Sequence, residues 1–107
     1  MVPMDKDPAI HDLLAWLPMR EQDWSVVQPD PWEADLCAIA ISRRDAPRHL
    51  VYVSTCESKA GRYYYACEAP TGTEGTDYTV VDEGANVSFA ELLAAMIRHL
   101  SPVRPAP

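Results

Sequence analysis

Two cysteines flank a glycine turn and three consecutive tyrosines in the middle of the chain, where twelve residues read CESKAGRYYYAC. Such a pair of thiols can form a disulfide, take part in redox chemistry or supply half of a metal site. If Gly61 and Arg62 form a two-residue hairpin turn, with glycine where a positive φ is needed, Cys56 lies directly opposite Cys67. A different turn, over residues 59–61, would break that pairing.

The sequence favours an unreactive role for these cysteines. Redox proteins usually carry C-x-x-C, which is absent, and no export signal directs the chain to an oxidising compartment. We therefore expect Cys56 and Cys67 to be reduced packing residues. Neither Cys37 nor the three histidines, which are scattered, complete a zinc-binding spacing, so we expect no metal and no cofactor.

Catalytic motifs are also missing from the sequence. There is no G-x-S-x-G, no H-E-x-x-H and no phosphate-binding glycine loop. His49, expected in the turn just before the strand that carries Cys56, cannot serve it as a base, because seven residues of extended chain separate them by about 23 Å. We therefore expect a protein that is not an enzyme.

Charge is distributed unevenly along the chain, whose net charge is −7. Residues 43–62 hold five Lys/Arg against two Asp/Glu, a balance of +3, and the remainder holds four against fourteen, a balance of −10. An acidic protein repels nucleic-acid phosphates and anionic lipids and attracts basic proteins. We expect a basic protein partner, no nucleic acid and no membrane, although acidity can also serve solubility alone.

Acidic and aromatic residues together predict the contact surface. Residues 21–35 interleave carboxylates with tryptophan, and in a strand Tyr63 and Tyr65 share one face while Tyr64 takes the other, where Tyr52 can join it. Aromatic residues anchor protein interfaces, but strands also favour them for packing. The predicted partner-binding residues are Glu21, Asp23, Asp30, Trp32, Glu33, Asp35, Tyr63 and Tyr65. Trp24 is expected under the first helix instead.

Two helices should frame a sheet. Asp7-Pro8 suits the start of a first helix, with Asp7 as the cap, and Pro18 ends its apolar stripe. A second helix begins at the capping box formed by Ser88 and Glu91, with Val87 placed to pack on Leu92.

Four or five short strands lie between the helices, over residues 24–28, 36–42, 50–57, 63–69 and 78–82, and residues 83–86 read as a turn. Short loops favour an antiparallel meander, with both helices on one sheet face. The chain is thus expected to be a single α+β domain over residues 1–107, with an ordered core over about residues 7–100 and tails at 1–6 and 102–107. Without an apolar run of membrane-spanning length, it is expected in the cytoplasm.

Several residues resemble a known family. LLAWL at residues 13–17, Trp32-Glu33, Ile39-x-Ile41, Asp45-x-Pro47 and a closing ELL helix are similar to a group of small immunity proteins of bacterial polymorphic-toxin systems. That group has D-N-P-G-W at the turn, whose glycine and tryptophan are missing here. The resemblance implies a cytoplasmic inhibitor that binds one toxin domain and occludes its active site.

Two other classes fit the same composition. An acidic secretion chaperone is equally small and usually dimeric, so a homodimer through a sheet edge or face is one alternative. A sensor domain that binds an apolar or cationic ligand between sheet and helices, among tyrosine and tryptophan side chains, is the other.

Overall fold

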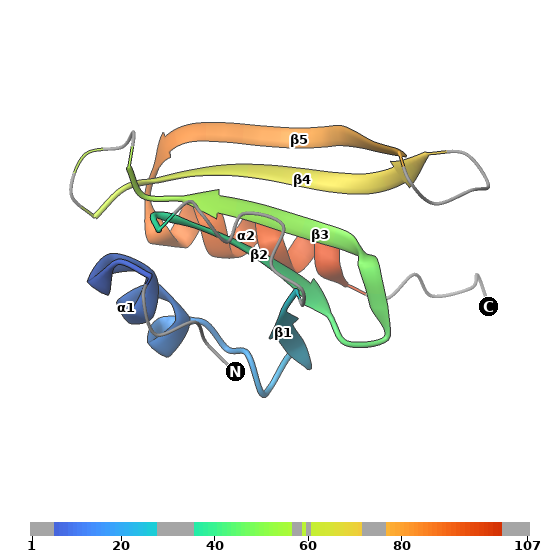
Figure 1. The fold of residues 1–107 in the computed structure, drawn as a ribbon, viewed down its shortest axis with the longest axis horizontal. Helices are drawn as coiled ribbons and strands as arrows, with labels where there is room; N and C mark the ends of the chain where they lie inside the picture. Colours follow the sequence, from blue (N-terminus) through green and yellow to red (C-terminus); the bar gives the residue numbers. More distant parts are fainter. Residues whose placement is uncertain (1–5, 28–35, 57–58, 60, 72–76, 102–107) are drawn as a thin grey trace.

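The computed structural model describes residues 6–27, 36–56, 59, 61–71 and 77–101 and confirms the expected α+β fold. Figure 1 shows its elements in chain order. They are α1 (Pro8–Trp16), β1 (Trp24–Val26), β2 (Ala38–Arg43), β3 (Ala46–Ser54), β4 (Tyr63–Thr71), β5 (Asp77–Val87) and α2 (Phe89–Leu100). The five strands form one antiparallel meander in the order β1-β2-β3-β4-β5, as the short loops predicted.

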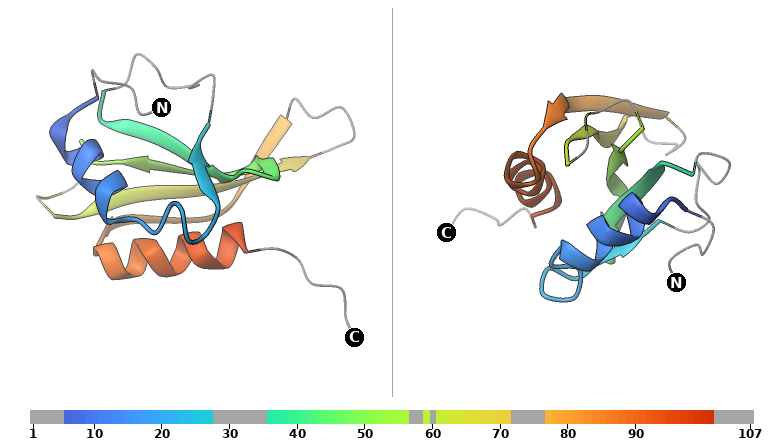
Figure 2. Two further views of the ribbon diagram at one scale, coloured as in Figure 1. Left: turned by 90° about the horizontal axis from the view of Figure 1, so that it is seen from below. Right: turned by 90° about the vertical axis from the view of Figure 1, so that its left-hand side faces the viewer.

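One face of the sheet forms the hydrophobic core with both helices, as expected. The apolar stripe of α1 and the buried side of α2 meet alternate residues of β2, β3 and β4. Trp24 joins this cluster, which confirms its expected place in the interior. Figure 2 shows the sheet curving around α2, with α1 near the edge of the sheet that β1 and β2 form. None of the described helices is long and apolar enough to cross a membrane.

The two helix starts differ in how they are capped. At α2 the Ser88 hydroxyl accepts a hydrogen bond from the Glu91 amide, and the Glu91 carboxylate accepts one from the Ser88 amide, so the predicted capping box is confirmed. At α1 Asp7 holds the N-cap position before Pro8, but its side chain makes no capping hydrogen bond. The predicted N-cap position of Asp7 is therefore confirmed, but not its capping hydrogen bond.

The register of β3 and β4 differs from the expected one. Strand β3 ends at Ser54, which pairs with Tyr64, and Val51 pairs with Cys67. The chain turns where the Arg62 amide donates to the Lys59 carbonyl, with Gly61 at φ 77°. Glycine thus takes its positive φ at the third of the four turn residues, rather than at the second as in the expected turn, which shifts the register. The prediction that Cys56 faces Cys67 is therefore wrong.

Strand β5 is longer than predicted and includes the residues expected to form a turn. Two bulges interrupt its pairing with β4, one between Gly84 and Val87 and one beside Val81. Asn86 adopts φ 55° in the first bulge, a conformation that asparagine tolerates. At Gly84 an added Cβ would lie 2.6 Å from the ring of Tyr65, so glycine here makes room for the aromatic side chain. The turn signal at residues 83–86 marks a bulge.

Burial of α2 predicts a large difference between two of its aliphatic residues. Leu92 is fully buried, whereas Ile97 is 39% exposed. Leu92→Ala should lower the free energy of unfolding by about 2–5 kcal/mol, because it leaves a cavity under the sheet. Ile97→Ala should cost less than about 1 kcal/mol. Urea denaturation measures both, and equal losses would contradict this packing of α2.

Candidate functional site

The sheet face opposite the helices carries aromatic, aliphatic and acidic side chains. Its members alternate with the core residues along β3, β4 and β5, and paired residues share a face. We call this set the acidic aromatic face and define it by Tyr52, Tyr64, Glu68, Tyr78, Val80 and Glu83. The strand pair that supplies most of it, residues 63–87 with the connecting loop, has five Asp/Glu and no Lys or Arg. This part of the chain therefore accounts for much of the net negative charge.

Specific contacts order the centre of the acidic aromatic face. The rings of Tyr52 and Tyr64 meet edge to face with centroids 6.0 Å apart. The Tyr64 hydroxyl donates a hydrogen bond of 2.9 Å to the Glu83 carboxylate. That hydrogen bond, with a smaller effect of burial, raises the pKa of Tyr64, so the phenol keeps its proton. Burial likewise raises the pKa of Glu68. A ring contact and a hydrogen bond thus connect Tyr52, Tyr64 and Glu83 into one cluster at the centre of this face.

Strand β5 adds a free edge to this face. Among the described strands, only β4 pairs with it, along one side. Tyr78, Val80 and Val81 are 41%, 50% and 57% exposed. The bulge beside Val81 and the nearby Asp82 and Glu83 are features by which proteins keep an edge from pairing indiscriminately. The edge therefore combines exposed apolar side chains with acidic ones.

The predicted binding residues are only partly assembled by the structure. Tyr63 and Tyr65 are 4% and 7% exposed, so the expectation that they present a free surface is wrong: alternation places both on the helix side. Glu21 is exposed, and Asp23 is exposed but forms an ion pair of 3.1 Å with Arg44. Four further predicted residues lie outside the described residues: Asp30, Trp32, Glu33 and Asp35.

The sequence analysis thus chose the two tyrosines that the structure buries, although it also assigned the neighbouring tyrosine to the opposite face. Tyr64 was expected on the opposite face from Tyr63 and Tyr65, with Tyr52 beside it, and both lie there. Glu83 was missed because the strand that carries it was expected to end at residue 82, whereas Val80 lay within the expected strand but was not assigned to a face. Finding both residues requires the register of β5 on β4, which sets the face on which each side chain lies.

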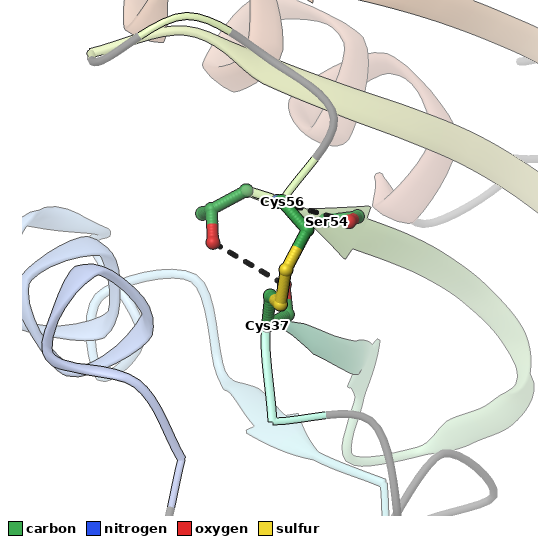
Figure 3. Close-up of a disulfide and its surroundings, with 4 residues drawn as sticks. Cys37, Ser54 and Cys56 are labelled. Carbon is green, nitrogen blue, oxygen red and sulfur yellow. Dashed lines mark hydrogen bonds between the residues drawn. A yellow bond between two sulfur atoms is a disulfide. The ribbon is translucent and has the colours of Figure 1, made fainter.

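A disulfide links Cys37, just before β2, to Cys56, just after β3, with Cα atoms 5.5 Å apart. Figure 3 shows it beside the hydrogen bonds that Thr55 donates to the Cys37 carbonyl and that the Cys56 amide donates to Ser54. The expectation that Cys56 is a reduced packing residue is therefore wrong. Cys56 extends past the end of the β3 ladder, where its neighbour across the sheet is Cys37 rather than Cys67.

An open cleft of about 340 Å³ lies beside this disulfide, between α1 and the segment that joins β3 to β4. Its walls combine two carboxylates, two cations and two aromatic rings. The lining residues are Asp7, Ala9, Asp12, Trp16, Thr55, Cys56, Lys59, Gly61, Arg62 and Tyr63. Trp16 packs edge to face on Phe89 of α2, with ring centroids 6.2 Å apart. The cleft can hold a small molecule, but it is open to solvent.

The histidines are less scattered than the sequence suggested. His49 lies in β3 rather than in the expected turn, and its ring centroid is 6.0 Å from that of His99 in the last turn of α2. His99 donates from Nε2 to the Glu68 carbonyl, 2.9 Å away. That hydrogen bond ties the end of α2 to β4.

Comparison of the chain with models of protein families, with curated proteins and with solved structures found no match.

Cysteine reactivity offers a direct test of this arrangement. Cys67 is a buried free thiol, and burial, with a smaller effect of Asp82, raises its pKa to about 12. The thiolate is the reactive form, so Cys67 should resist alkylation at mildly alkaline pH. Mass spectrometry after iodoacetamide treatment should find no adduct on the native protein, one after unfolding, and three after unfolding with reduction. Three adducts without reductant would contradict the disulfide.

Proposed function

We propose that the protein is an acidic protein-binding module of the immunity type, which inhibits a basic partner protein by covering that partner's functional surface. The acidic aromatic face, with the adjoining edge of β5, is the contact surface. One observation carries this proposal: the exposed ring of Tyr78 and the half-buried ring of Tyr64 lie among carboxylates, in a strand pair whose sequence has no Lys or Arg.

Charge and aromatic area have complementary roles in such a contact. Carboxylates at the rim steer a basic partner toward the face and raise the rate of association. The tyrosine and valine side chains that the partner covers then supply most of the affinity. Tyrosine rings suit this role because they lose little conformational entropy when they are covered. The edge-to-face pair of Tyr52 and Tyr64 is already ordered before binding, which lowers this cost further.

The free edge of β5 adds a backbone contribution. An extended segment of the partner can pair with an edge strand and extend the sheet, with main-chain hydrogen bonds for affinity and alternate side chains for specificity. The Glu83 carboxylate favours a basic segment in that position, whereas Asp82 already forms an ion pair of 3.4 Å with Arg98 of α2. The inhibitory part of the proposal rests on the resemblance to immunity proteins, whose role is to occlude one toxin domain.

Matched lysine substitutions test the contact surface. Val80 on the face and Ile97 on α2 are both exposed aliphatic residues, 50% and 39%. The tagged protein should capture one basic partner from the source organism's lysate, and high salt should release it. Val80→Lys should weaken binding to the purified partner by about tenfold or more, whereas Ile97→Lys should leave it unchanged.

Two results would contradict the proposal. The first is equal binding by the wild type and both variants, which would place the contact elsewhere. The second is a bound partner whose own activity is unaffected by the wild-type chain, which would leave binding without inhibition.

A second candidate function follows from the cleft. The exposed ring of Trp16 beside Asp7 and Asp12 suits a small cationic or aromatic ligand, as expected of a sensor domain. A thermal-shift screen with such ligands tests it: a rise in melting temperature that Trp16→Ala abolishes would favour the sensor.

Light scattering of the isolated protein distinguishes a monomer from a third arrangement, a homodimer through the β5 edge. Such a homodimer would hide the proposed contact surface.

A further inference from the structure

Three metal-binding side chains meet beside the disulfide. The Asp7 carboxylate and the sulfur atoms of Cys37 and Cys56 all lie within 4.8 Å of one another. They come from three separate segments: the start of α1, the residue before β2 and the residues after β3. We propose that reduction of this disulfide converts the group into a zinc site, in which the two thiolates and the Asp7 carboxylate bind the ion. This inference is independent of the proposed function.

Backbone hydrogen bonds hold the three ligands together without help from the disulfide. The Asp7 amide donates to the Leu36 carbonyl over 2.9 Å, which places Asp7 next to the residue that precedes Cys37. The Thr55 amide donates to the Cys37 carbonyl over 2.9 Å, which places Cys56 next to Cys37. The first hydrogen bond thus ties Asp7 to the segment that carries Cys37, and the second ties the segment that carries Cys56 to Cys37. Reduction therefore leaves the three side chains close together.

The distances suit zinc as well as a disulfide. Tetrahedral zinc with Zn–S bonds of about 2.3 Å requires the two sulfurs to lie about 3.8 Å apart. Cα atoms 5.5 Å apart allow that separation after small side-chain rotations. The Asp7 carboxylate makes no capping hydrogen bond at α1, and one of its oxygens lies within 4.8 Å of both sulfurs, so it can supply the third ligand. Water fills the fourth position in the manner of zinc sites that have three protein ligands.

The redox step balances with a dithiol as reductant. Cys56 is exposed and Cys37 half-buried, so a thiolate of the dithiol attacks the Cys56 sulfur and releases the Cys37 thiolate. The second thiol then closes its own disulfide and frees Cys56. The protein disulfide is thus reduced by two electrons, and the dithiol is oxidised by two. Binding of Zn²⁺ leaves both cysteines as thiolates and releases the thiol protons to solvent.

The donor set selects a particular class of metal. Two thiolates favour a soft or borderline ion such as zinc over magnesium or calcium, which prefer oxygen ligands. Asp12 on the neighbouring turn of α1 adds favourable negative charge, whereas Lys59 and Arg62 across the cleft oppose it. These opposing charges, with only three protein ligands, predict weaker binding than in a four-cysteine site.

Zinc content of the oxidised and reduced protein tests the proposal. The full chain, free of any tag, is reduced anaerobically or left oxidised, equilibrated with Zn²⁺ and desalted, and its metal is measured by mass spectrometry. The reduced form should retain one equivalent per chain and the oxidised form none above background. Cd²⁺ in place of Zn²⁺ should add the ultraviolet charge-transfer band of thiolate ligands to the reduced form only.

Two variants separate the site from adventitious binding. Asp7→Asn keeps both cysteines and the disulfide, and it should weaken zinc binding to the reduced form by about tenfold or more. Cys67→Ser removes only the buried free thiol and should bind zinc as the wild type does. Equal zinc in the oxidised and reduced forms, or unchanged affinity in Asp7→Asn, would overturn the proposal. Circular dichroism of each variant confirms that the fold is intact.

Discussion

Alternation along the strands governs both what this protein buries and what it presents. Val51, Val53 and Cys67 face the helices and lose contact with water, and the pleat then forces their sequence neighbours to the other side. A shift of one residue would exchange the faces, burying Glu68 and exposing the core. The hydrophobic stripe under α2 therefore fixes the position of every ring and carboxylate on the acidic aromatic face. Core packing and the proposed function depend on the same register.

Local signals were strong enough in the sequence to predict the elements and their order. The capping box at Ser88, the proline that follows α1 and the short turns each act over a few residues, so the sequence predicted two helices around an antiparallel meander. The cysteine pairing required the register of β4 on β3, which depends on one turn. Gly61 fitted two turn types, and the sequence held no local feature that chose between them.

Long-range contacts explain the remaining differences. Residues 83–86 contain glycine and asparagine, which usually end a strand, but pairing with β4 continues through them as a bulge because the ring of Tyr65 occupies the space above Gly84. The disulfide partner of Cys56 is Cys37, which precedes β2 and lies nineteen residues earlier in the chain. A disulfide of this kind can be redox-sensitive rather than structural, as the zinc site proposed beside Asp7 requires.

The central claim is that β4 and β5, not the cleft beside α1, form the contact with a basic partner. Hydrogen–deuterium exchange of the chain, free and bound to the purified partner, tests it most directly because exchange reports on the backbone of every segment. The account predicts slower exchange in the partner complex over residues 77–83, where β5 offers unpaired amides. Protection limited to α1 and residues 59–63, with β5 unchanged, would contradict it and move the contact to the cleft.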